Sequence, residues 1–226
     1  MILAALAGAS GRMGMAVQSL LPATPDISLC ARIDPALGTS FAGCAARPDV
    51  VIDFSTPRAL EEELAFCVRK GAALVLATTG HPPQARAMLE EAAAHIAVFH
   101  SANLSYGAYV LGRLAAQARR MLGDGYDAAI VERHHRGKRD APSGTAQQLA
   151  QAMGMSGMPT LSVRGGGLVG VHEVGFYGPM DTLTLKHDAL DRRLFARGAL
   201  EAARWLVACA PGLYGMEDWL STCDAR

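Results

Sequence analysis

The chain has 226 residues, of which 50% are hydrophobic and 19% are charged, enough for one large or two small domains with a buried core. Its 21 Lys and Arg residues balance its 21 Asp and Glu residues, so the charge does not point to nucleic acid or an anionic membrane as a partner. The apolar start at residues 1–7 is too short for a membrane span and lacks the basic residues of a signal peptide.

The cysteines are scattered and odd in number. They are Cys30, Cys44, Cys67, Cys209 and Cys223. Because no two of them form a Cys-x-x-Cys pair, we predict neither a zinc site nor a disulfide framework. A reducing cytoplasm is therefore the expected location.

The N-terminal stretch has the order strand, glycine turn, helix, strand, acid. An apolar run at residues 2–6 predicts a buried parallel strand, residues 15–21 a helix, and residues 28–33 a second strand that ends at Asp34. The turn Gly8-Ala9-Ser10-Gly11-Arg12-Met13-Gly14 has alanine where the usual dinucleotide fingerprint has its first glycine. A purely structural turn is the alternative, but an acid about twenty residues beyond the last glycine favours a dinucleotide-binding unit.

Three further apolar runs predict strands at residues 49–53, 72–77 and 96–99, with helices at 58–70 and 83–95 between them. Each strand ends in small polar residues, and ligands of open parallel sheets bind outside the carboxyl ends of the strands. The residues expected to line one crevice with the glycine turn are Thr78, Thr79, Gly80, Ser101, Ala102 and Asn103.

A long helix at residues 106–122 is expected to lead into a second part of the chain. Its later strands, at residues 160–164, 169–177 and 181–187, are separated by glycine-rich turns and are predicted to be antiparallel. A helix at residues 193–209 follows. The predicted fold is therefore α/β: a parallel Rossmann-type sheet, then an α+β domain with a mostly antiparallel sheet.

The stretch Glu132-Arg133-His134-His135-Arg136-Gly137-Lys138-Arg139-Asp140-Ala141-Pro142-Ser143-Gly144-Thr145 concentrates titratable groups. It lies between a predicted strand at 127–131 and a predicted helix at 146–153, so we expect a loop with Ser143 as the helix N-cap. A helix N-terminus beside Lys138 suits a small carboxylate ligand, and the histidines suit proton transfer. A solvated polar loop is the alternative interpretation.

Taken together, these motifs resemble the 4-hydroxy-tetrahydrodipicolinate reductase family over nearly the whole chain. The resemblance is carried by residues 8–14, Asp53-Phe54-Ser55, Thr78-Thr79-Gly80, residues 101–105, residues 132–146, and Arg164, Gly165, Gly170 and His172. It implies that NADH or NADPH reduces a cyclic imine dicarboxylate to tetrahydrodipicolinate, with loss of water, in lysine and diaminopimelate biosynthesis. From the charge balance and the spacing of the cysteines and histidines, we expect no metal, nucleic-acid or membrane partner.

The resemblance also implies site residues and an architecture. His134 would be the proton donor and acceptor and Lys138 a second proton donor, while substrate carboxylates would be held by His135, Ser143, Gly144 and Thr145. The cofactor would be contacted by Gly8, Ala9, Ser10, Gly11, Arg12, Met13, Asp34, Ala77, Thr78, Thr79, Ser101, Ala102, Asn103 and Leu104. Residues 1–105 would bind the dinucleotide, with residues from about 193 to 226 returning to that domain. Residues 106–192 would bind substrate and join a homotetramer.

The chain departs from the family pattern after Asp34, where Pro35 stands in place of a basic residue and the stretch up to Asp49 is short. A carboxylate at the end of the second strand would repel the 2′-phosphate of NADPH, although Arg32 and Arg12 lie near enough in sequence to offset it. We therefore expect the enzyme to use both cofactors, with kcat/KM for NADH at least equal to that for NADPH.

Two other classes of function remain open from the sequence. A non-catalytic dinucleotide-binding regulator would bind NAD(H) but would need no histidine and lysine pair. A metal-dependent hydrolase could use His134 and His135, but adjacent residues rarely face one ion, and no companion ligands stand at metal spacing.

Overall fold

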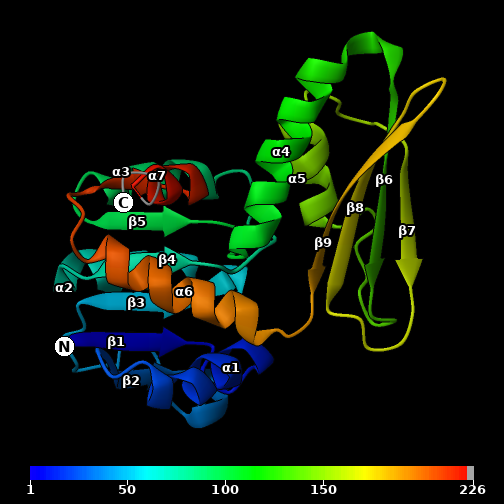
Figure 1. Ribbon diagram of the computed structural model, residues 1–226. Helices are drawn as coiled ribbons and strands as arrows, with labels where there is room; N and C mark the ends of the chain where they lie inside the picture. Colours follow the sequence, from blue (N-terminus) through cyan, green and yellow to red (C-terminus); the bar gives the residue numbers. More distant parts are fainter. Residues whose placement is uncertain (223–226) are drawn as a thin grey trace. The chain divides into compact units, whose positions relative to one another are not determined.

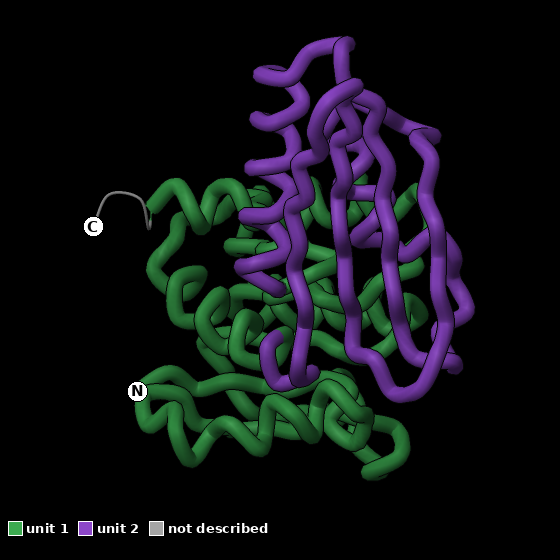
Figure 2. Tube along the Cα trace, turned by 45° about the vertical axis from the view of Figure 1, so that its right-hand side comes forward, with its two compact units in different colours: residues 1–104, 195–226 green, residues 105–194 purple. Residues whose placement is uncertain are grey.

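A computed structural model describes residues 1–222, so Cys223 and the rest of the C-terminal tail lie outside the described part. The chain forms two compact units, shown in Figure 2. Unit 1 comprises residues 1–104 and the described residues from 195 onward, and unit 2 comprises residues 105–194. The C-terminal residues thus belong to the unit that begins the chain.

Unit 1 is built on a six-stranded parallel sheet in the order β10-β5-β4-β3-β1-β2. Its strands are β1 (Ile2–Ala7), β2 (Ile27–Ile33), β3 (Val50–Asp53), β4 (Ala73–Leu76), β5 (Ala97–His100) and β10 (Gly212–Tyr214). β3 and β4 are buried at every residue. This explains their unbroken apolar character, since helices cover both faces of such a sheet (Figure 1).

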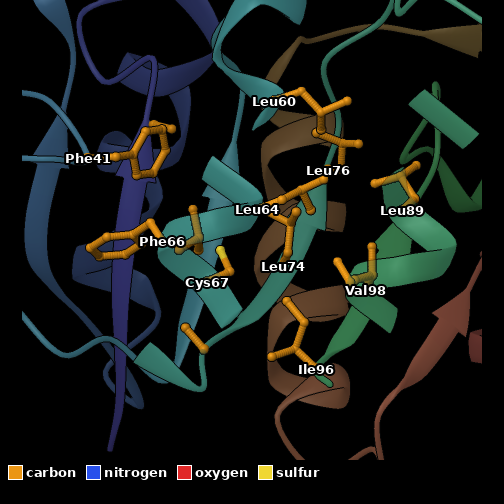
Figure 3. Close-up of a cluster of buried hydrophobic side chains, with 14 of the residues drawn as sticks. Phe41, Leu60, Leu64, Phe66, Cys67, Leu74, Leu76, Leu89, Ile96 and Val98 are labelled. Carbon is orange, nitrogen blue, oxygen red and sulfur yellow. The ribbon is translucent and has the colours of Figure 1, made fainter. Parts of the chain in front are cut away.

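The two faces of this sheet are covered by different helices. The helices of unit 1 are α1 (Arg12–Leu20), α2 (Leu60–Lys70), α3 (Ala85–Ala93), α6 (Arg193–Leu206) and α7 (Met216–Ser221), with short 3-10 turns at Leu21–Ala23, Pro35–Leu37 and Pro57–Ala59. Val98 packs into the cluster formed with α2 and α3 (Figure 3). Its neighbour Phe99 makes edge contacts with Trp205 of α6 and Trp219 of α7, because successive residues of a strand point to opposite faces.

Unit 2 is a four-stranded sheet in the order β7-β6-β8-β9, with two helices packed on one face (Figure 1). Its elements are α4 (Tyr106–Leu122), a 3-10 turn (Gly123–Gly125), β6 (Asp127–His134), α5 (Gly144–Ala152), β7 (Thr160–Arg164), β8 (Gly170–Tyr177) and β9 (Thr182–Ala189). The core between sheet and helices includes Leu111 of α4, Leu149 of α5, Ile130 of β6 and Phe176 of β8. Alternate residues of β6 are buried, as expected for a strand with one covered face.

The fold class predicted from the sequence is confirmed, two local expectations are corrected, and one strand was not predicted. β6 does not end at Val131 but continues to His134, because Glu132, Arg133 and His134 pair with β7 and β8. β7 runs parallel to β6, so only the β6–β8 and β8–β9 pairs are antiparallel. The tail contributes a strand, β10, which pairs with β5. Within residues 1–222, no helix is long and apolar enough to cross a membrane.

Candidate functional sites

The glycine turn in unit 1 brings three backbone segments close together. Gly8 has φ +72°, and a Cβ there would lie 2.4 Å from the carbonyl oxygen of Phe54. A Cβ on Gly14 would lie 2.3 Å from the carbonyl oxygen of Gly8, so both positions require glycine. Gly11 caps α1 without a side-chain hydrogen bond, which leaves the helix N-terminus suited to a phosphate.

Asp34 lies at the end of β2 beside this turn, as the sequence predicts. Its Oδ2 accepts hydrogen bonds from the N–H of Ser10 at 2.8 Å and from the hydroxyl of Ser10 at 2.6 Å, and its Oδ1 accepts from the N–H of Ala36 at 2.9 Å. The bonds from Ser10 lower the pKa of Asp34, so it is an anion at neutral pH. The side chain is 8% exposed and holds the glycine turn in place. Arg12 and Arg32 are exposed.

Polar atoms without partners mark the carboxyl ends of β3 and β4. Among the described residues, the hydroxyls of Ser55 and Thr78 are buried and have no hydrogen-bond partner. Buried polar groups normally have partners, so these two hydroxyls at the carboxyl ends of the strands fit a polar ligand such as a dinucleotide. The hydroxyl of Ser101 instead donates to the carbonyl of Asn103 at 2.7 Å and shapes the turn after β5.

The other predicted cofactor residues differ in exposure. Ala9 and Leu104 are buried, Met13, Ala77 and Asn103 are half-buried, and Ser10, Gly11, Thr79 and Ala102 are exposed. They all lie in the turns at the carboxyl ends of β1, β4 and β5 or at the start of α1.

A separate cluster of titratable side chains occupies unit 2. His134 is the last residue of β6, and its Nδ1 lies 2.5 Å from Oε2 of Glu132. The ring of His172, on β8, meets the His134 ring edge-on with centroids 5.1 Å apart. Burial lowers the pKa of His134, and the neighbouring Glu132 carboxylate opposes that shift. Burial also lowers the pKa of His172, to about 4, so this ring is neutral at physiological pH.

The loop after β6 holds the predicted lysine. The Nζ of Lys138 lies 2.9 Å from Oδ2 of Asp140, and the N–H of Lys138 donates to the carbonyl of His135 at 3.1 Å. The positive charge of Lys138 contributes to lowering the pKa of His134, which places the two predicted acid–base groups within electrostatic range. His135 is half-buried in the same loop.

The start of α5 confirms Ser143 as its N-cap, because its hydroxyl accepts from the N–H of Ala146 at 3.2 Å. Ser143 is 1% exposed, and its Oγ also lies 3.0 Å from Nε2 of His172. Gly144 is exposed, with no atom within 4 Å of where a Cβ would stand, and Thr145 is half-buried. Gly144 is therefore the exposed residue at this helix terminus, and its backbone N–H donates a hydrogen bond to the carboxylate of Asp140.

The sequence assigned no role to three residues that the fold brings to His134: Glu132, Arg164 and His172. Arg164 reaches Glu132 from β7 with two hydrogen bonds of 2.7 Å. Alternation along β6 could have placed Glu132 on the face of His134, since the two are two residues apart on one strand. The residues beside Arg164 and His172 in the sequence did not indicate that the fold brings these two side chains to Glu132 and His134.

A Rossmann-type sheet with a glycine turn, together with a second unit that carries a histidine and lysine cluster, defines a dinucleotide-dependent oxidoreductase. The family model "Dihydrodipicolinate reductase, N-terminus" matches residues 2–104, and "Dihydrodipicolinate reductase, C-terminus" matches residues 107–220. The chain belongs to this family.

Curated relatives agree with this assignment, and a solved structure shares the fold. The chain is 37% identical over 268 aligned positions to the 4-hydroxy-tetrahydrodipicolinate reductase of Anaeromyxobacter sp. (strain Fw109-5), with 100% of both sequences covered. It is 36% identical to the reductase of that name from Rickettsia rickettsii (strain Sheila Smith), covering 94% of this chain and 96% of the relative. The fold matches a dipicolinate-bound dihydrodipicolinate reductase from Paenisporosarcina sp. TG-14, with a TM-score of 0.77 at 24% identity over 96% of this chain and 99% of the other.

Proposed function

We propose that the protein is a 4-hydroxy-tetrahydrodipicolinate reductase of lysine and diaminopimelate biosynthesis. It reduces its substrate to tetrahydrodipicolinate, with loss of water, at the expense of NADH or NADPH. The observation that carries this proposal is the match of both family models across the chain. The orphaned hydroxyls of Ser55 and Thr78 and the glycine turn fit the cofactor, which supplies the hydride when bound.

In this proposal each unit binds one of the two ligands. Unit 1 binds the dinucleotide, with the pyrophosphate at the glycine turn and α1 and the adenosine ribose near Asp34. The cofactor-contacting residues proposed here are Gly8, Ala9, Ser10, Gly11, Arg12, Met13, Asp34, Ala77, Thr78, Thr79, Ser101, Ala102, Asn103 and Leu104. Unit 2 binds the cyclic dicarboxylate.

Within unit 2, His134 exchanges the proton and Lys138 acts as a second proton donor and a cation for the substrate carboxylates. The N-terminal turn of α5 binds a carboxylate through the backbone of Gly144 and Thr145 and the hydroxyl of Thr145, with His135 as a further donor. Since the Ser143 hydroxyl already contacts Ala146 and His172, its part is to fix the helix start where the carboxylate binds.

We further propose a homotetramer joined through the face of the unit 2 sheet that α4 and α5 leave uncovered. Val131 of β6 pairs in register with Leu161 of β7 on that face, where Leu161 is 61% exposed and Val163 is 39% exposed. Exposed neighbouring apolar side chains on a sheet favour a protein partner. Light scattering of the wild type and of Leu161→Lys tests this point, with the tetramer expected only in the wild type.

A cytoplasmic location completes the proposal. The cysteines that the structure describes, Cys30, Cys44, Cys67 and Cys209, are unpaired, which suits a reducing compartment.

The decisive experiment measures NADH and NADPH oxidation with freshly generated 4-hydroxy-tetrahydrodipicolinate. We expect turnover with both cofactors and none without the dicarboxylate. His134→Gln should lower kcat by about 100- to 10,000-fold, the usual contribution of a general acid–base group, and should leave binding of pyridine-2,6-dicarboxylate largely intact. A defect confined to KM would contradict the role assigned to His134. Cofactor binding without any turnover would indicate a non-catalytic dinucleotide-binding protein instead.

A further inference from the structure

Glu132 is a fully buried carboxylate surrounded by donors. Its side chain is 0% exposed, and Arg164 binds both of its oxygens at 2.7 Å, Nη1 to Oε2 and Nη2 to Oε1. The N–H of Ser143 donates to Oε1 at 3.2 Å, and Nδ1 of His134 lies 2.5 Å from Oε2. Strands β6 and β7 and the cap of α5 therefore converge on one acid that no step of the proposed reaction uses.

These contacts keep Glu132 ionised. Burial would raise the pKa of this carboxyl, but hydrogen bonds from Arg164, Ser162 and His134 outweigh it and lower the pKa to about 2. The pKa of Arg164 rises in turn through its bonds to Glu132. At physiological pH the acid is thus an anion that can only accept hydrogen bonds.

An acceptor at 2.5 Å determines which nitrogen of His134 carries the proton. In the neutral ring one nitrogen donates and the other accepts, so Nδ1 must be the protonated one and Nε2 must carry the lone pair. The Nε2 side is kept clear by Gly170, where a Cβ would come within 3.0 Å of Nε2. The ring is thereby oriented with Nε2 as the nitrogen that can exchange a proton with a ligand.

We propose that Glu132, clamped by Arg164, is the positioning residue of His134: it holds the Nδ1–H tautomer, aims Nε2 at the substrate and stabilises the imidazolium formed during proton transfer. This rests on the role of His134 in the proposed function. Arg164 also donates to the carbonyl of Asp140 at 2.6 Å, so the same guanidinium ties the lysine-bearing loop to the clamp.

The charged and titratable groups that face His134 are Glu132 on its own strand, Lys138 in the loop, Arg164 on β7 and His172 on β8. Burial and the two cations favour the neutral ring, and Glu132 alone among these groups favours the imidazolium. Replacing Glu132 by glutamine removes the anion and keeps the shape. The pKa of His134 should then fall, and the limb of the kcat–pH profile that reports His134 should move to lower pH.

The first measurement needs only the wild-type chain. Long-range ¹H–¹⁵N NMR spectra, recorded at a pH above the pKa of His134, should show the Nδ1–H tautomer for this ring, with His134→Gln used to assign its signals. An Nε2–H tautomer would overturn the proposal even if every Glu132 variant failed to fold.

The second measurement compares Glu132→Gln with Asp124→Asn. Asp124 follows α4 and, like Glu132, accepts a hydrogen bond from an arginine, Arg119 at 2.7 Å, but its side chain is 99% exposed. Its variant therefore removes an arginine-bound carboxylate away from His134. We expect kcat of Glu132→Gln to fall by between about tenfold and about 10⁴-fold, the upper figure being that for losing the orienting acid of a Ser-His-Asp triad. The His134 titration should move to lower pH, and KM should change little. Asp124→Asn should keep the wild-type kcat and the wild-type titration of His134.

A purely structural role predicts otherwise. Glu132→Gln would then be less heat-stable, but its His134 would titrate as in the wild type, and its kcat–pH profile would keep its position; that result refutes positioning. The two proposals can fail separately. If the wild type does not reduce the dicarboxylate, but the pKa of His134 is lower in Glu132→Gln than in the wild type, the proposed function is refuted and the positioning of His134 by Glu132 is supported.

Discussion

A buried acid in the core of unit 1 makes the stability of the protein depend on pH. Glu63, on α2, is 1% exposed, and among the described residues its Oε1 has no hydrogen-bond partner. Asp53, at the end of β3, is 0% exposed and uses only Oδ1, which accepts from the N–H of Ser55 at 2.8 Å. Burial, and then the charge of Asp53, raise the pKa of Glu63 well above its ordinary value. The folded chain therefore holds a proton that the unfolded chain releases near pH 4.3, the ordinary glutamate pKa.

The sign and size of the effect follow from proton linkage. Between the unfolded and the folded pKa of Glu63, the folded state binds one proton more than the unfolded state. The free energy of unfolding therefore falls as the pH rises, by about 1.4 kcal/mol per pH unit from this group. The stabilisation is fully present below the unfolded pKa and is lost as the pH rises through the folded pKa. Glu63→Gln keeps the shape but cannot ionise, so it removes this slope.

Urea unfolding followed by far-UV circular dichroism, from pH 4.5 to 8.5 at one protein concentration, measures the effect. The stability of Glu63→Gln relative to the wild type should increase with pH by about 1.4 kcal/mol per unit, starting above pH 5. The exposed Glu61 on the same helix provides the control, since Glu61→Gln should follow the wild type at every pH. A difference between Glu63→Gln and the wild type that stays constant with pH would refute the assignment of a buried, protonated Glu63.

Three further substitutions test the two proposed sites. Asp34→Ser should move the kcat/KM ratio toward NADPH by removing a negative charge near the ribose; a wild-type preference for NADPH of tenfold, about 1.4 kcal/mol, would contradict the role given to Asp34. Lys138→Arg should retain substrate binding but not full kcat, since a guanidinium does not give up a proton, and full kcat would show that the charge near Asp140 is sufficient. Gly170→Ala should lower kcat and leave the melting temperature nearly unchanged, because the added Cβ lies 3.0 Å from Nε2 of His134. An unchanged kcat would show that proton transfer does not use this side of the ring.

Much of the fold was determined by local sequence. Helix 106–122 and strand 160–164 have the bounds expected from their residue patterns, and Ser143 caps α5 as its position before a run of helix formers predicts. Unbroken apolar runs between glycine-rich turns identified the parallel strands of unit 1, because strands covered on both faces contain few polar residues. The prediction of a site at residues 132–145 rested on their concentration of histidines, a lysine and carboxylates, a mixture that no packing demand calls for.

Pairings distant in sequence were decided only by the tertiary structure. β6 extends to His134 because β7 and β8 supply its hydrogen-bond partners, and a polar sequence cannot by itself show that such partners exist. Arg164 is 32 residues from Glu132, and Asp26 is 178 residues from its partner Arg204. Likewise, β10 was assigned by its pairing with β5 and not by its own three residues.

The same limit applies to protonation. The acid of Glu63 and the ring of His172 resemble surface residues in the sequence, yet folding removes both from water and shifts their pKa values. Residue type determines which groups can carry a charge, whereas burial and the neighbours that the fold supplies determine whether they do. The sequence thus identified the titratable groups available to this protein. Only the fold brings Arg164 and the cap of α5 to Glu132, the acid that contacts His134.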